Sequence, residues 1–138
     1  MDSVIDMQIM RYLNLFEQIT RIRTNYCFKY NETIFFCVPY NSISKAIGRN
    51  AINIKRLNEI LGRKIKVIAV PNGEQGARRF IQDIVEPVMF KDLQNLENEI
   101  VVIGSTQSKA ALIGRNKRRF LEMQKIVKDF FGKEFRIA

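Results

Sequence analysis

The chain has 138 residues, of which 46% are hydrophobic and 27% charged, and its formal net charge is +9. This composition excludes intrinsic disorder and favours a nucleic acid over a membrane as partner of a basic globular protein. With two cysteines and no histidine, the ordinary zinc sites and histidine-based triads are excluded. No apolar run approaches a membrane span, and the start Met1-Asp2-Ser3 lacks a secretory signal, so we expect a cytoplasmic protein.

The first predicted element is a helix that ends near residue 20. Ser3 is placed to cap it, with Asp6 three residues later as the acidic partner of a capping box. Apolar residues then recur at helical spacing over four turns. These residues are Ile5, Ile9, Leu13, Phe16 and Ile19.

A β-hairpin is expected next, over residues 24–30 and 33–38. Both segments are rich in aromatic and β-branched residues, and Asn31-Glu32 between them predicts a short turn. Cys27 and Cys37 fall on the two arms, where a disulfide is geometrically possible. Because cytosolic thiols are usually reduced, we expect both cysteines to pack as small hydrophobic residues instead.

Two helices and a strand complete the first half of the chain. Ser42 can cap a short helix, which Gly48 ends in a left-handed conformation. Asn50 can cap a second helix that stops at Gly62, and residues 64–70 alternate as a strand. The apolar positions of the second helix are Ile54, Leu57, Ile60 and Leu61. The predicted order is α-β-β-α-α-β.

The same order is predicted again after a short polar linker at residues 72–76, which separates one domain at 1–71 from another at 77–138. The second set comprises a helix at 77–86, strands at 88–93 and 99–103, a short helix capped by Ser105 or Thr106 and ended by Gly114, a helix at 117–131 and a strand at 134–137. The closing glycines are 70 residues apart and the turn glycines 66. The last helix is therefore expected to be one turn longer than its counterpart.

The short sequence Ile47-Gly48-Arg49-Asn50 recurs as Ile113-Gly114-Arg115-Asn116. Each copy is predicted to join two helices, so that the amides opening the second helix and its dipole favour an anion such as phosphate. The alternative is purely structural, with Gly and Asn serving only as helix caps.

Basic residues around both copies favour the phosphate interpretation. Cations near a helix N-terminus are unfavourable by about 0.3–1 kcal/mol each, so helix stability does not account for them, whereas a bound polyanion would. The alternative is a basic face that is merely solvated. The residues concerned are Lys45, Arg49, Lys55 and Arg56 in the first copy, and Arg115, Lys117, Arg118 and Arg119 in the second.

Other side chains give no sign of a catalytic site. The carboxylates show no pairing that would support acid–base chemistry, and the chain lacks a Gly-Lys-Ser/Thr phosphate loop. We therefore expect a protein that is not an enzyme. The aromatic residues are expected to lie in the core rather than to stack on bases. They are Phe28, Tyr30, Phe35, Phe36, Phe80, Phe90, Phe120, Phe130 and Phe131.

The chain resembles tandem KH domains of the type II order, and in particular the archaeal NusA family. The resemblance covers nearly the whole chain and is strongest at Ala46-Ile47-Gly48-Arg49-Asn50, at residues 54–57 and 61–65, and at Leu112-Ile113-Gly114-Arg115-Asn116. The opening helix, residues 11–17, is similar to the family's start. The resemblance implies an α+β fold of two KH domains, each with a three-stranded sheet packed by helices.

In KH domains a G-x-x-G loop clamps the backbone of about four nucleotides while a neighbouring groove takes the bases. Here the fourth loop position is Ala51 in one copy and Lys117 in the other, so neither loop has the second glycine. A Cβ there should push the strand outward, and Lys117 could supply charge instead. The candidate RNA-binding residues are Lys45, Gly48, Arg49, Asn50, Ala51, Lys55, Arg56, Gly114, Arg115, Asn116, Lys117, Arg118 and Arg119.

The resemblance implies a monomeric protein that binds single-stranded RNA, without metal or cofactor, during transcription elongation or termination. RNA polymerase would be a further partner. Two alternatives stay open: a KH protein of ribosome assembly that binds ribosomal RNA, and a basic scaffold that binds an acidic protein.

Overall fold

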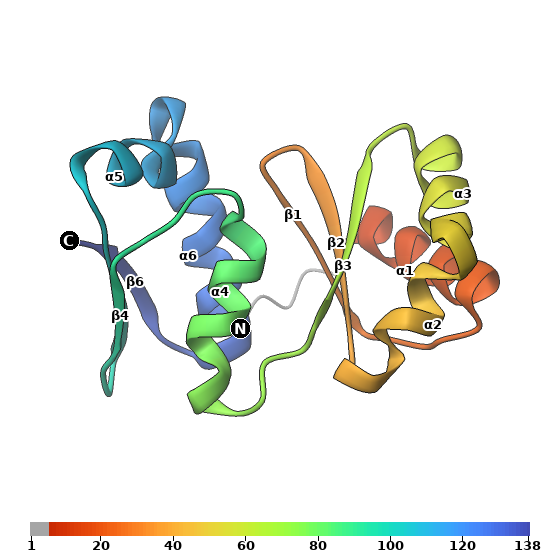
Figure 1. Ribbon diagram of the computed structural model, residues 1–138, viewed down its shortest axis with the longest axis horizontal. Helices are drawn as coiled ribbons and strands as arrows, with labels where there is room; N and C mark the ends of the chain where they lie inside the picture. Colours follow the sequence, from red (N-terminus) through yellow and green to blue (C-terminus); the bar gives the residue numbers. More distant parts are fainter. Residues whose placement is uncertain (1–5) are drawn as a thin grey trace. The chain divides into compact units, whose positions relative to one another are not determined.

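The computed structural model describes residues 6–138, which divide into two compact units, one ending at Val70 and the other beginning at Pro71. Each unit is an α+β structure in which three helices lie on one side of a three-stranded sheet (Figure 1). Among the described residues, none of the helices is both long and apolar enough to cross a membrane.

The first unit has the predicted order α-β-β-α-α-β. Its elements are α1 Met7–Thr20, β1 Tyr26–Tyr30, β2 Thr33–Val38, α2 Ile43–Ile47, α3 Ile52–Leu61 and β3 Lys64–Ala69. The hairpin turn is at Asn31 and Glu32, as predicted, and both residues have positive φ, at 52° and 61°. Central β2 pairs antiparallel with β1 and parallel with β3. A parallel pair needs a crossover connection, which α2 and α3 supply.

The N-cap of helix α1 is Asp6, three residues later than the predicted Ser3. The Asp6 carboxylate accepts hydrogen bonds from the backbone N–H groups of Gln8, at 2.9 Å, and Ile9, at 3.3 Å. Asp6 is therefore the N-cap itself and not the acidic partner of a capping box, because its acceptor stands directly before the helical stripe. Ser3 and Ile5 lie outside the described residues.

The first core lies between the helices and β2. The rings of Phe16 and Phe36 stack at its centre with centroids 4.4 Å apart. Its buried residues are Tyr12, Phe16, Ile34, Phe36, Val38, Ala46, Leu57 and Val67. Ile60, predicted to belong to the buried stripe of α3, is 57% exposed. The packed positions of this helix follow Ile54, Leu57 and Leu61, which leaves Ile60 beside that stripe.

The second unit repeats the order. Its elements are α4 Ala77–Val85, β4 Asp92–Asn95, β5 Glu99–Ile103, α5 Thr106–Ile113, α6 Arg118–Phe131 and β6 Glu134–Ile137, with a single 3₁₀ turn, η3 Glu74–Gly76, before α4. Central β5 pairs antiparallel with β4 and parallel with β6. Helix α6 has 14 residues and α3 has 10, which agrees with the extra turn expected from the glycine spacing.

Strand β4 starts later than the predicted residue 88. The Val88 N–H donates to the Val85 carbonyl at 2.9 Å, which forms a turn directly after α4. Pairing with β5 starts only at Lys91, whose N–H donates to the Ile103 carbonyl at 2.7 Å. The apolar residues before it therefore lie outside the sheet, with Phe90 buried and Met89 66% exposed.

The aromatic residues expected in the core are all buried or half-buried. In the second unit the ring of Phe80 in α4 contacts those of Phe130 and Phe131 in α6, with centroids 4.7 Å and 6.0 Å apart. The additional turn of α6 carries both of these partners. It is therefore packed against α4.

The two cysteines are free thiols, and the hairpin register explains why no disulfide forms. Cys27 lies opposite Phe36, and Cys37 opposite Tyr26. Because neighbouring residues of a strand alternate between faces, the two thiols point to opposite sides of the sheet. Burial raises the pKa of Cys27 to about 12, so this thiol stays protonated at neutral pH.

Candidate nucleic-acid interface

Both units contain the same turn between their second and third helices. Gly48 follows α2 with φ 81° and ψ 167°, and Gly114 follows α5 with φ 74° and ψ 172°. The predicted left-handed helical exit is wrong in ψ, because the chain leaves each helix in an extended direction. This region of backbone space is essentially restricted to glycine.

Each turn glycine also packs against a side chain five residues later. A Cβ on Gly48 would lie 2.9 Å from the side-chain Nδ2 of Asn53, and one on Gly114 would lie 2.6 Å from Cγ of Arg119. Asn53 also donates to the Lys45 carbonyl at 3.3 Å, which ties the start of α3 to α2. Asn53 is not among the residues predicted from the sequence, although it occupies the same position in the first copy as the predicted Arg119 in the second.

The two residues before each following helix have a left-handed backbone. Asn50 and Asn116 have φ of 55° and 57°, and the next residues, Ala51 and Lys117, have φ of 58° and 59°. The predicted N-cap role of the asparagines is therefore wrong. Ala51 and Lys117 directly precede α3 and α6, and neither helix has a side-chain cap.

A backbone hydrogen bond closes each turn over these residues. The N–H of Ala51 donates to the Gly48 carbonyl at 3.1 Å, and the N–H of Lys117 to the Gly114 carbonyl at 3.2 Å. The fourth loop position thus keeps a conformation that glycine adopts without strain, although neither residue is glycine. For an L-residue this conformation costs about 1–2 kcal/mol.

Exposed cations surround both turns, and neither α3 nor α6 has an acidic residue in its first turn. The exposed cations are Lys45, Arg49, Lys55 and Arg56 in the first unit and Arg115, Lys117 and Arg118 in the second. Uncapped N–H groups and side-chain charges of one sign make each turn suited to an anion.

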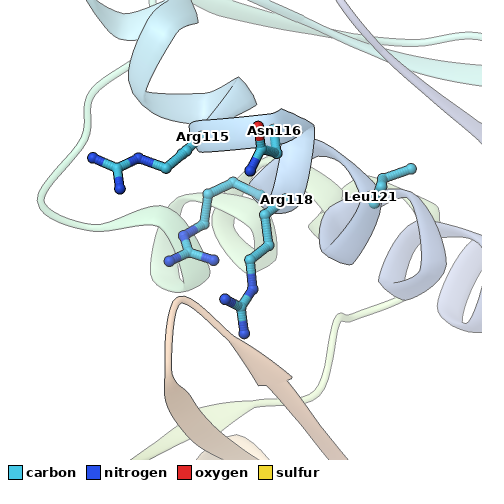
Figure 2. Close-up of a pocket in the computed structure, with 5 residues that line it drawn as sticks. Arg115, Asn116, Arg118 and Leu121 are labelled. Carbon is cyan, nitrogen blue, oxygen red and sulfur yellow. The ribbon is translucent and has the colours of Figure 1, made fainter.

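A cavity of about 430 Å³ lies beside the second turn (Figure 2). It is lined by Arg115, Asn116, Arg118, Arg119 and Leu121. In Figure 2 the Arg115 side chain lies at the left and the Leu121 side chain at the right, with Arg118 between them, so that charged and apolar residues both line this cavity. Such a combination suits a charged molecule that also has an apolar face.

The structure places Arg119 apart from the other candidate cations. Its side chain is only 19% exposed, pairs with Glu122 at 3.0 Å and packs under Gly114. We therefore assign it to the support of the turn rather than to its exposed surface. The remaining candidates lie in or next to the turns.

The architecture of the chain is α+β and consistent with a KH-type fold. The crystal structure of APE1850 matches it with a TM-score of 0.68 and 25% sequence identity, covering 97% of this chain and 100% of that one. No protein-family model matches the sequence.

Sequence similarity connects part of the chain to archaeal NusA proteins. The "Probable transcription termination protein NusA" of Methanocaldococcus jannaschii is 28% identical over 86 residues, which are 62% of this chain and 45% of that protein. The protein of the same name from Methanococcus vannielii is 30% identical over 96 residues, 68% of this chain and 53% of its own length. The chain thus spans about half the length of these relatives.

Proposed function

We propose that this chain is a single-stranded RNA-binding protein of two tandem type II KH domains, at residues 1–71 and 77–138. It acts on nascent RNA in transcription elongation or termination, in the manner of a NusA-like factor, and is not an enzyme. Its RNA-binding residues lie in and around the two helix-joining turns.

The observation that carries this proposal is the geometric identity of the two turns. Both present a glycine in a backbone conformation reserved for glycine, two left-handed residues and an uncapped helix N-terminus. Exposed cations gather at both, where they would destabilise a helix unless an anion were bound. The phosphate groups of RNA supply that anion, and unpaired bases can contact the surface beside the turn.

The transcription role rests on the named relatives and not on the geometry. Both are archaeal proteins named for transcription termination. Their similarity supports a role for this chain beside RNA polymerase, which would be its second partner.

Fluorescence anisotropy with a labelled single strand and a duplex of the same sequence tests RNA binding. We expect the single strand to bind more tightly, because pairing hides the bases. Substituting Asp for Arg49 and Asn50, or for Arg115 and Asn116, should weaken binding strongly and leave the circular-dichroism melt nearly unchanged. The matched control substitutes Asp for Arg23 and Asn25, which are exposed and lie outside both turns.

Three outcomes would contradict the proposal. One is equal affinity for single strand and duplex, and another is a melt that collapses together with the binding, which would make the turn residues structural caps. The third is equally strong binding to polyglutamate competitor, which would favour the scaffold alternative over RNA.

Crosslinking the protein to RNA in cells and sequencing the recovered RNA tests the transcription role. Nascent messenger transcripts are expected among the targets. Recovery of ribosomal RNA alone would replace this role by ribosome assembly while leaving RNA binding in place.

A further inference from the structure

The two turns have the same backbone and the same arginine after the glycine, Arg49 or Arg115, but they differ in the side chains that follow. Aligned on the turn glycine, the pair Ala51-Ile52 of the first unit corresponds to Lys117-Arg118 of the second. One helical turn further on, Lys55 corresponds to Leu121. After the arginine and asparagine that both turns share, the first unit therefore has apolar residues followed by a cation, whereas the second has cations followed by an apolar residue.

In the first unit, Ile52 stands at the start of α3 with 54% of its surface exposed. No cation occupies the fourth or fifth position of this turn. Lys55 and Arg56, both exposed, come one turn of helix later, about 5 Å along the axis. Beyond Arg49, an RNA strand on this surface meets an apolar side chain first and further positive charge one helical turn later.

In the second unit, Lys117 and Arg118 bring charge directly to the turn, next to Arg115. Leu121 follows with 56% of its surface exposed and lines the same cavity as Arg115 and Arg118. The position after Leu121 is Glu122, which pairs with Arg119 at 3.0 Å, where the first unit has the exposed Arg56. Charge is thus concentrated at the turn and apolar surface lies beyond it.

We propose that the two units contact RNA in reversed order: the second turn holds a phosphate and Leu121 a base, whereas Ile52 at the first turn contacts a base and Lys55 with Arg56 hold the phosphate. This inference rests on the proposed function, and it assigns different parts of the nucleotide to two sites with one backbone geometry. Apolar contact with a base is insensitive to salt, whereas each neutralised phosphate makes binding salt-dependent.

The test measures the affinity for a labelled single-stranded RNA between about 50 and 200 mM salt. Ile52→Asn should weaken binding about tenfold at every salt concentration, since an apolar contact is lost without a charge. Ile60→Asn is the matched control, because Ile60 lies on the same helix, is 57% exposed and is two turns away. It should bind as the unchanged protein does.

Substituting Ala for Lys117 and Arg118 should reduce the slope of log affinity against log salt by about 1.4, because two phosphate contacts on a single strand contribute about 0.7 each. Substituting Ala for Lys55 and Arg56 should act in the same way. The control substitutes Ala for Lys125 and Lys128, which are exposed residues on α6 beyond its first turn. It should leave the slope of log affinity against log salt nearly unchanged.

The reversed order is overturned if Ile52→Asn binds like Ile60→Asn, or if it changes the salt slope as the lysine and arginine variants do. It is also overturned if the Lys117 and Arg118 variant keeps the full slope. Absence of RNA binding by the unchanged protein contradicts the proposed function instead, so the two failures are distinguishable. Circular-dichroism melts of all variants verify that the exposed substitutions leave the fold intact.

Discussion

At the scale of single residues, the fourth position of each turn keeps a backbone suited to glycine without having one. Ala51 and Lys117 have φ of 58° and 59°, and each donates its N–H back to the turn glycine. Any residue other than glycine at this position therefore reduces the stability of the fold. Lys117 supplies a charge in return, and Ala51 does not.

Ala51→Gly and Lys117→Gly should each stabilise their unit by about 0.5–1 kcal/mol. Relief of about 1–2 kcal/mol of left-handed strain exceeds the loss of about 0.5–1 kcal/mol from glycine's greater freedom in the unfolded chain. The two variants should differ in RNA binding, since only Lys117→Gly removes a cation. Denaturant melts and anisotropy measure both effects. Destabilisation by Ala51→Gly would contradict the assigned backbone conformation.

The thiol of Cys27 should be unreactive in the folded protein. Its pKa is raised to about 12 by burial, so at pH 8 the thiolate fraction is at least about 10²-fold lower than that of an ordinary cysteine. Alkylation at pH 8, followed by mass spectrometry, should modify the unfolded chain much faster than the folded one. Equal rates would show that the thiol is accessible and ionised.

The same pKa shift gives the sign of a pH effect on stability. The folded state keeps the proton that the unfolded state loses above about pH 9, so the stabilisation from Cys27 is present below pH 9 and declines as the pH rises toward 12. The unfolding free energy of the unchanged protein should thus fall more steeply over this range than that of Cys27→Ser. Parallel curves would contradict the shift.

At the scale of elements, the structure differs most clearly from the sequence-based predictions at the helix caps. Ser42 and Ser105 both precede a short helix in the sequence, yet only the Ser105 hydroxyl accepts a hydrogen bond, from the Ser108 N–H at 3.1 Å. Ser42 has a helical backbone and no side-chain cap, because a 3₁₀ turn, Tyr40–Ser42, already leads into α2.

Ser105→Ala should therefore destabilise the protein by about 1 kcal/mol, and Ser42→Ala should have almost no effect. The pair controls for the chemistry of the substitution, since both variants replace a serine before a short helix and only Ser105 caps its helix. Thermal or urea unfolding of the two variants provides the measurement. A larger loss for Ser42→Ala than for Ser105→Ala would reverse the assignment of the caps.

The order of elements could be predicted from the sequence because it depends on local periodicity. The stripe from Ile9 to Ile19 and the alternation after Gly62 are both local signals. The start of β4 could not be predicted, because Val88 is as apolar as a strand residue, yet its N–H donates to the Val85 carbonyl in a turn and not to the sheet. A local turn thus takes the place of strand pairing at this point, although the β-propensity of the residues favours a strand.

The candidate site could be located from the repeated Ile-Gly-Arg-Asn sequence but not described in detail. Glycine permits both a left-handed and an extended exit, so the sequence does not decide ψ at Gly48 or Gly114. The distinct place of Arg119 depends on its packing under Gly114 and its pairing with Glu122. A charged residue in a basic run gives no local sign of that burial.

At the scale of the whole molecule, two sites on one chain should bind a long RNA cooperatively. The second contact forms at an effective concentration of order millimolar, so the intact chain should exceed a single-turn variant by about 10² to 10⁴ in affinity. The single-turn variants have Asp in place of Arg49 and Asn50, or of Arg115 and Asn116.

Affinities for RNAs of increasing length test this expectation. The advantage of the intact chain should emerge once the RNA is long enough to reach both turns, and short RNAs should show none. If the intact protein binds a long RNA no better than the tighter variant, one of the turns serves another purpose.

Two units of one topology on a single chain risk exchanging equivalent elements while they fold. The unequal lengths of the helices disfavour such an exchange. In the second unit Phe130 and Phe131 end a helix of 14 residues, and α3 has 10. In place of α6, α3 would not supply the two rings that contact Phe80, so the unequal lengths favour the native pairing of helix and sheet.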